Sequence, residues 1–136
     1  MIVAAARIER RVRRNAKEAS HVHAGASAQR VSAYVARLES GRFLRDTLDD
    51  AARACAISRR RFTELFRTRV GETWLKRVQR LRIEHARRLL RDTDKSIAAV
   101  AFESGFDDAS HFHRVFKSIV KCTPMEERAC ANRRTR

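Results

Sequence analysis

The sequence is poor in the residues that end or interrupt helices. Its 136 residues include only four Gly and one Pro. A many-stranded sandwich needs frequent turn residues, so this shortage argues against that class. Ala and Arg, which are good helix formers, are abundant instead. Because 43% of the residues are hydrophobic, enough for a core, we predict a folded all-α protein.

Cysteine is scarce, and its spacing excludes two common uses. Cys55, Cys122 and Cys130 are odd in number and form no CxxC pair. This pattern indicates neither a disulfide framework nor a zinc module. Such thiols fit a reducing compartment, where small buried cysteines behave as modest hydrophobes. We predict no metal ion and no other cofactor.

Long apolar runs and catalytic motifs are also missing. No stretch approaches the ~20 apolar residues that a membrane-spanning helix needs, and charged residues soon follow the short apolar start. The chain has no Gly-rich phosphate loop, no HExxH and no recognisable nucleophile elbow. We therefore expect a cytoplasmic protein that has no membrane partner and is not an enzyme.

Acidic residues are too few to balance the basic ones. The 31 Lys and Arg face 16 Asp and Glu, so the net charge is +15 and the sequence pI is near 11.4. Such an excess attracts polyanions and is the electrostatic footprint of nucleic-acid binding. A solubilising surface or a ribosome-associated basic protein would show the same excess, so charge alone leaves these alternatives open.

The chain divides into three segments by composition. Residues 1–29 form a basic leader, which we expect to be flexible or partly helical, with a linker or disordered arm in its small and polar second half. Residues 30–129 carry the helical patterns of a folded domain. Residues 130–136 form a basic C-terminal tail.

Two stretches of the folded domain repeat each other. "LFRTRVGETW" at 65–74 and "VFKSIVKCTP" at 115–124 place Phe66 and Phe116 at the same point of the motif. Each stretch ends a short helix, a turn and a second helix, which is the outline of a helix-turn-helix unit. We expect these second helices to begin at caps Ser58 and Asp107 or Asp108.

The repeated units are separated by one long amphipathic segment. Residues 74–92 have no Gly or Pro, and at 1.5 Å per residue they form a helix of roughly 28 Å. The stripe that we expect it to bury comprises Trp74, Leu75, Val78, Leu81, Ala86, Leu89 and Leu90. The predicted fold is therefore two helix-turn-helix subdomains joined by a long linking helix, a duplicated homeodomain-like arrangement.

This arrangement suits double-stranded DNA. Helices of such units enter the major groove, and successive major grooves on one face lie ~34 Å apart. One chain could therefore place two reading helices in adjacent grooves as a monomer. In the reading helix of the first unit, expected at residues 59–70, the side chains suited to bases are Arg60, Thr63 and Glu64. Glu64 could instead pair with Arg60 or Arg67 along its own helix.

The remaining polar residues of these faces suit other roles. In the second reading helix, His111, His113 and Arg114 project from the face opposite Phe112 and Phe116. His111 and His113 are two apart and point to different faces, which argues against a shared metal ion. The residues that we assign to phosphates, which fix position without reading sequence, are Arg59, Arg61, Arg67, Ser110, His113 and Lys117.

From Ser96 to Arg128 the sequence resembles the AraC/XylS family of bacterial transcription regulators. The matching elements are Ser96-Ile97, Ala101, Gly105-Phe106, Ser110, Phe112, Arg114, Phe116-Lys117, Thr123-Pro124 and Arg128. The resemblance extends over about residues 30–129. It implies a seven-helix domain that binds asymmetric DNA sites, associates with the nucleoid and contacts RNA polymerase. By motif position it implies base contacts from Arg60, Thr63, Glu64, Ala109, His111 and Arg114.

The chain departs from the family pattern in three places. Lys121 occupies a helix end that Gly71 holds in the first unit, so we expect the second cap to be frayed or strained. Glu127 stands where an aromatic is common, which removes an anchor for the last helix. The family's effector-binding domain is missing. We therefore expect either a stand-alone regulator or a degenerate fragment of a longer one.

The hypothesis that we favour is a sequence-specific transcription regulator. The alternative is a non-specific nucleic-acid-binding protein, which the basic leader and the unusual Lys121 support. A third hypothesis is an alkyl-transfer repair protein with a zinc-held cysteine, against which the scattered cysteines argue.

Overall fold

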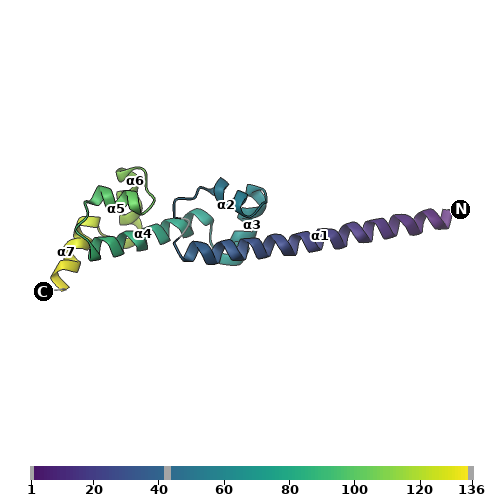
Figure 1. Cartoon of the computed structure of the whole chain (residues 1–136), viewed down its shortest axis with the longest axis horizontal. Helices are drawn as coiled ribbons and strands as arrows, with labels where there is room; N and C mark the ends of the chain where they lie inside the picture. Colours follow the sequence, from purple (N-terminus) through teal and green to yellow (C-terminus); the bar gives the residue numbers. More distant parts are fainter. Residues whose placement is uncertain (1, 42–43, 135–136) are drawn as a thin grey trace.

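The computed structural model describes residues 2–41 and 44–134, and their regular structure is entirely helical. The described part of the chain therefore confirms the all-α prediction. Figure 1 shows one helix-turn-helix unit at each end of the linking helix α4. The helices are α1 (Ile2–Glu39), α2 (Leu48–Ala54), α3 (Arg59–Val70), α4 (Trp74–Asp92), α5 (Ile97–Glu103), α6 (Ala109–Val120) and α7 (Pro124–Arg134).

The first helix is longer than the sequence suggested. We expected a linker in residues 20–29, but α1 continues through them without a break. Three polar side chains bond to carbonyls of their own helix and do not break it. His21 donates to Lys17, His23 donates to Ala19, and Ser27 donates to His23, at 2.7 to 2.9 Å. The N-terminal half of α1 therefore projects beyond the body of the molecule (Figure 1).

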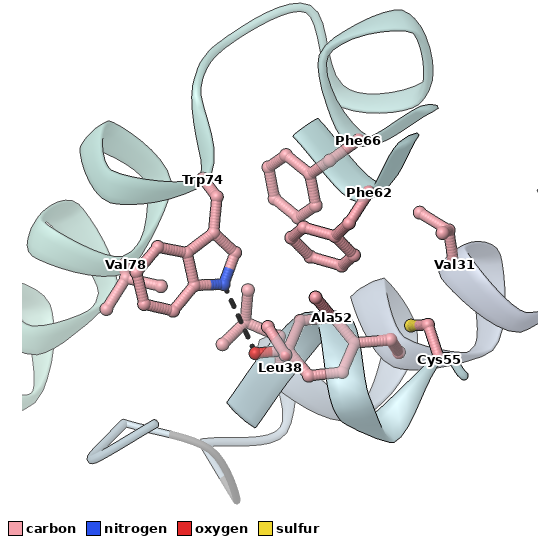
Figure 2. Close-up of a cluster of buried hydrophobic side chains, with 10 residues drawn as sticks. Val31, Leu38, Ala52, Cys55, Phe62, Phe66, Trp74 and Val78 are labelled. Atoms are coloured by element: carbon pink, nitrogen blue, oxygen red, sulfur yellow. Dashed lines mark hydrogen bonds between the residues drawn. The ribbon is translucent and has the colours of Figure 1, made fainter. Parts of the chain in front are cut away.

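The first unit packs around aromatic side chains from α1, α3 and the start of α4. Phe62 and Phe66 are fully buried against Val31 and Leu38 of α1 (Figure 2). The Trp74 indole N–H donates to the Tyr34 hydroxyl at 3.2 Å, which satisfies the one polar atom of the indole. This bond links the first helix of the unit directly to the linking helix.

The second unit has its own core around the other half of α4. Ile83, Ala86 and Leu90 meet Phe112 and Phe116 there, all almost wholly buried. Because α4 turns by about 100° per residue, Val78 and Ile83 face different sides of the helix. The predicted single stripe is therefore wrong at Leu75, which is 55% exposed, and it omitted Ile83.

The two units repeat each other at the level of the backbone. In the turns, the Ile57 amide donates to Ala52, and the Phe106 amide donates to Ala101. Ser58 and Asp108 then cap α3 and α6 with their side chains, as predicted. The repeat distance grows from 49 residues at the turn to 50 at the cap, because the second turn has one extra residue.

The predicted fraying at Lys121 is wrong. Lys121 adopts φ 68° and ψ 12°, close to the φ 82° and ψ −1° of Gly71 in the first unit. Its amide donates to the carbonyl of Lys117 at 3.0 Å, and its side chain donates to the carbonyl of Ser118. The cap is therefore fully formed, and what remains of the expectation is the cost of a left-handed conformation for a residue with a Cβ.

The last helix, α7, is anchored by polar contacts, although Glu127 stands where the family commonly has an aromatic residue. Arg87 of α4 donates to the Glu127 carboxylate at 2.8 Å, and the Glu127 side chain is only 14% exposed. Arg128 donates to the carbonyl of Lys95 at 2.5 Å. An ion pair thus holds α7 against α4, at the position where the resemblance suggested a lost anchor, and the Arg128 bond ties α7 to the loop that follows α4.

Candidate nucleic-acid interface

The outward face of α3 carries the polar side chains that the sequence analysis assigned to it. Phe62 and Phe66 point into the core, which leaves the other faces of this helix to solvent. The cap at Ser58 sets where the helix begins, so it also sets which residues lie in the first exposed turn. The predicted contact residues of α3 are all exposed: Arg59, Arg60, Arg61, Thr63, Glu64 and Arg67.

Glu64 is engaged with its own helix in the free protein. Its carboxylate lies 3.3 Å from Arg60 and 3.7 Å from Arg61. The pairing of Glu64 with Arg60 that we considered as an alternative is therefore present, although the second partner of Glu64 is Arg61 and not Arg67. Exposed pairs of this kind contribute roughly 0–1 kcal/mol, so either arginine can exchange the carboxylate for a nucleic-acid group at little cost.

Arg59 lies at the start of α3 and is tied to the preceding helix. Its guanidinium is 3.1 Å from the Asp49 carboxylate of α2, and both side chains are more than half exposed. Thr63 donates to the Arg59 carbonyl at 2.9 Å, which sets the orientation of its hydroxyl. The ion pair therefore links α2 to the start of α3, whereas the Thr63 bond lies within α3 itself.

The outward face of α6 carries two imidazoles, and it is less acidic than the outward face of α3, which carries Glu64. The Asp108 carboxylate accepts the amides of Ser110 and His111 at 3.0 and 3.1 Å, which closes the first turn. Five of the predicted contact residues on this helix are exposed: Ala109, Ser110, His113, Arg114 and Lys117. His111 is only half-exposed, because its ring packs edge-on against Phe106 at 5.6 Å between centroids.

The two histidines of α6 rest on different aromatic rings. His113 packs against Phe112 at 5.8 Å between centroids, whereas His111 packs against Phe106. They therefore diverge, as their spacing indicates. Within residues 2–41 and 44–134, no three His, Cys, Asp or Glu side chains are grouped in a way that could hold a metal ion.

One contact of the linking helix was missed by sequence reasoning. Arg82 of α4 donates to the backbone carbonyls of Leu44 and Asp46, which lie in the segment between α1 and α2. Burial lowers the pKa of Arg82, which is unusual for an arginine on a helix otherwise rich in solvated ones. No sequence signal marks this residue, because its partners are backbone atoms nearly 40 positions away.

The remaining polar groups do not suggest a different kind of site. Burial raises the pKa of Cys55, as expected for a structural thiol, because it disfavours the thiolate. No helix in the described part of the chain has the length and apolar content to cross a membrane. The exposed charged faces of α3 and α6 are therefore the strongest candidate interface.

Known proteins similar to this chain are helix-turn-helix transcriptional regulators. Residues 51–129 match the family model described as a helix-turn-helix domain. The transcriptional regulator GlxA of Rhizobium meliloti (strain 1021) is 37% identical over 73 residues, which cover 54% of this chain and 22% of that protein. The transcriptional activator NphR of a Rhodococcus species is 41% identical over 78 residues, covering 57% and 23%. This chain thus spans less than a quarter of either relative.

Solved structures extend the similarity over both units. The DNA-binding domain of the transcriptional factor AdpA, solved with a target DNA, superposes with a TM-score of 0.71 at 26% identity, covering 77% of this chain and 95% of that one. A regulator with an AraC-type DNA-binding domain from Chromobacterium violaceum gives a TM-score of 0.65 at 31% identity, covering 79% and 96%. The chain belongs to the AraC/XylS-type family of helix-turn-helix transcriptional regulators.

Proposed function

We propose that this chain is a sequence-specific DNA-binding regulator that inserts α3 and α6 into adjacent major grooves of one duplex. The observation that carries the proposal is the duplication itself. Two units with corresponding caps and turns stand at opposite ends of α4 (Figure 1). In each unit the second helix, α3 or α6, has an outward face of polar residues. A helix of 19 residues extends over about 28 Å, which is close to the ~34 Å between successive grooves once the width of the units is added.

The first unit supplies most of the base reading in this proposal. The Arg60 side chain is 91% exposed and can donate two hydrogen bonds to a guanine. Thr63 lies one turn further along the helix and suits a base edge or a thymine methyl. Glu64 accepts from a cytosine when Arg60 has moved to its own base. Arg59, Arg61 and Arg67 bind the phosphates on either side.

The second unit contributes position more than sequence. Ala109 and Arg114 remain candidates for base contact, but the His111 ring is partly covered by Phe106. Ser110, His113 and Lys117 suit phosphates. A unit of this kind adds affinity and fixes the direction of binding, and one chain then binds an asymmetric site as a monomer.

RNA polymerase is the second partner in the proposal. Support comes from the family membership and from a relative named as a transcriptional activator. Transcription from a promoter bearing the selected site should then change when this chain is added. An unchanged transcript level with the site occupied would exclude this part of the proposal.

Selection of bound sequences from a random DNA pool, followed by a salt titration on the winner, tests the function. We expect protection of two adjacent major grooves within about 20 bp. Equal affinity for all sequences at physiological salt would exclude the proposal. It would favour the non-specific alternative, which predicts a steep salt dependence without a preferred site.

Two matched arginine variants separate the predicted roles. Arg60→Ala should relax preference at one base position and cost about 1–3 kcal/mol at the selected site, whereas Arg59→Ala should weaken all sites by a similar factor. The two residues are neighbours on one helix and carry the same charge, so each controls for the other. If both variants scale all sites equally, the base assignment is wrong.

A further inference from the structure

The two units touch each other beside the linking helix. Among the described residues, the principal helix contacts lie within a unit or join a unit to α4, and none of them joins one unit directly to the other. The exception is the segment just before α2, whose residues 44–46 reach the turn between α5 and α6. Arg45 donates to the carbonyl of Phe102 at 2.6 Å and lies 4.1 Å from the centre of its ring. The same guanidinium is 3.9 Å from Asp107.

Gly105 makes the contact close. Its φ of +89° already favours glycine, and the space around it does so independently. A Cβ added at this position would lie 2.5 Å from the carbonyl oxygen of Leu44 and 3.0 Å from the Arg82 side chain. The second unit therefore approaches the first to a distance that only a glycine permits.

Arg82 connects this contact to α4. It donates to the carbonyls of Leu44 and Asp46 while its guanidinium lies 5.8 Å from the centre of the Phe106 ring. One side chain of the linking helix thus contacts both the segment before α2 and the turn of the second unit. We call the set formed by residues 44–46, Arg82 and residues 102–107 the inter-unit clamp.

We propose that the inter-unit clamp fixes the rotation of the second unit about α4, and thereby sets which spacing between two half-sites the protein accepts. The inference rests on the proposed function, because it concerns how two reading helices share one duplex. One base pair advances the duplex by about 3.4 Å and rotates it by roughly 35°. A unit held by three independent contacts tolerates much less rotation than that. A unit held by α4 alone has more freedom, because its orientation then depends only on side-chain packing along one helix.

The test compares spacing variants of the selected site. One base pair is inserted or deleted between the two protected grooves, and affinity is measured for wild type, Arg45→Ala and Gly105→Ala. Arg53→Ala is the control, since Arg53 is exposed and its ion pair among the described residues is with Asp50, inside the first unit. It removes the same charge as Arg45→Ala but leaves the clamp intact.

We expect Arg45→Ala to reduce the preference for the native spacing by about three- to tenfold, since it removes a hydrogen bond, a ring contact and an ion pair. Gly105→Ala should reduce it further. Arg45 is exposed, so its variant remains informative if Gly105→Ala does not fold. Arg53→Ala should keep the wild-type spacing preference.

The result that would overturn the inference differs measurably from the expected one. If Arg45→Ala weakens native and altered spacings by the same factor, the clamp does not set the spacing, and the inference is overturned while the proposed function stands. A wild-type protein that shows no preferred sequence overturns both. A merely structural contribution of Arg45 lowers the folded fraction and scales every site together, so it cannot imitate a change in preference.

Discussion

Replacing Lys121 with Gly measures how much strain the second unit stores at the end of α6. Lys121 holds φ 68° with its amide bonded to Lys117. A residue with a Cβ pays roughly 1–2 kcal/mol in this region. Gly removes that strain but makes the unfolded chain more flexible, which costs about 0.4–1 kcal/mol. The exposed bond from the Lys121 side chain to Ser118 is also lost. We expect a net gain of about 0.5 kcal/mol in the free energy of unfolding.

Two glycines provide the matched comparison. Gly71 ends α3 with φ +82° and has no atom within 4 Å of an added Cβ, so Gly71→Ala introduces backbone strain alone. We expect it to lose about 1 kcal/mol. Gly105→Ala adds a collision with the Leu44 carbonyl to the same kind of strain, so its loss should be larger. From the most to the least stable, the predicted order is Lys121→Gly, wild type, Gly71→Ala and Gly105→Ala.

Urea unfolding followed by circular dichroism measures this order, with the slope of each curve confirming that the unfolded states are comparable. A difference of 0.5 kcal/mol moves the thermal midpoint by about 1–3 °C in a chain of this size. The reasoning is refuted if Lys121→Gly destabilises the protein while Gly71→Ala does not. That result would mean that the side chain of Lys121 contributes more than its backbone strain removes.

Three further predictions concern separate parts of the molecule. Glu127→Ala should lose about 1 kcal/mol of stability, because it removes the partner of Arg87 from a mostly buried position. Glu126→Ala is the control and should lose less, since that carboxylate is exposed and accepts the Thr123 amide at the start of α7. Equal losses would contradict the anchoring role of Glu127. Burial lowers the pKa of His85, so the native state binds its proton less readily than the unfolded chain, and the resulting stability, present above pH 6.5, should be lost as pH falls toward the lowered pKa. His85→Gln should flatten this part of the thermal-midpoint profile between pH 7 and 5, and an unchanged slope would contradict the assignment. Removal of residues 2–24 should change the free energy of unfolding by less than about 0.5 kcal/mol, because residues 7–23 are exposed throughout and, from residue 5 onward, the first buried side chain is Ser27. A larger loss in urea titration would show that α1 is stabilised as one unit.

Local chemistry in the sequence was enough to predict the repeated units. Ser58 was expected to cap a helix because its hydroxyl can accept an amide from the first turn, and it does so. Ser96 caps α5 in the same way. Thr47 and Asp50, three residues apart, form a reciprocal capping box at the start of α2. Gly71 ends α3 in the left-handed conformation. These features involve residues within four positions of one another, so their geometry is set by short-range hydrogen bonds.

Periodicity was less reliable where one helix serves two cores. The sequence predicted one stripe along α4, but the first unit buries Trp74 and Val78 on one side and the second buries Ile83 and Leu90 on another. An apolar pattern shows that a helix has a buried face, but it does not show that the face changes direction when the neighbours change. For the same reason the exposure of Leu75 was not foreseen.

The sequence alone therefore determined the fold class, the two helix-turn-helix units and which polar residues stand on their outward helices, because each depends on helix period and on caps a few residues long. Only the tertiary structure decided how the units face each other. The Leu44 carbonyl meets the backbone of Gly105, and the Arg82 side chain donates to the same carbonyl. Both contacts are made to backbone atoms, which no side-chain pattern encodes. It also decided that Lys121 closes its helix as completely as Gly71 does, since the surrounding hydrogen bonds hold a conformation that the residue type alone disfavours.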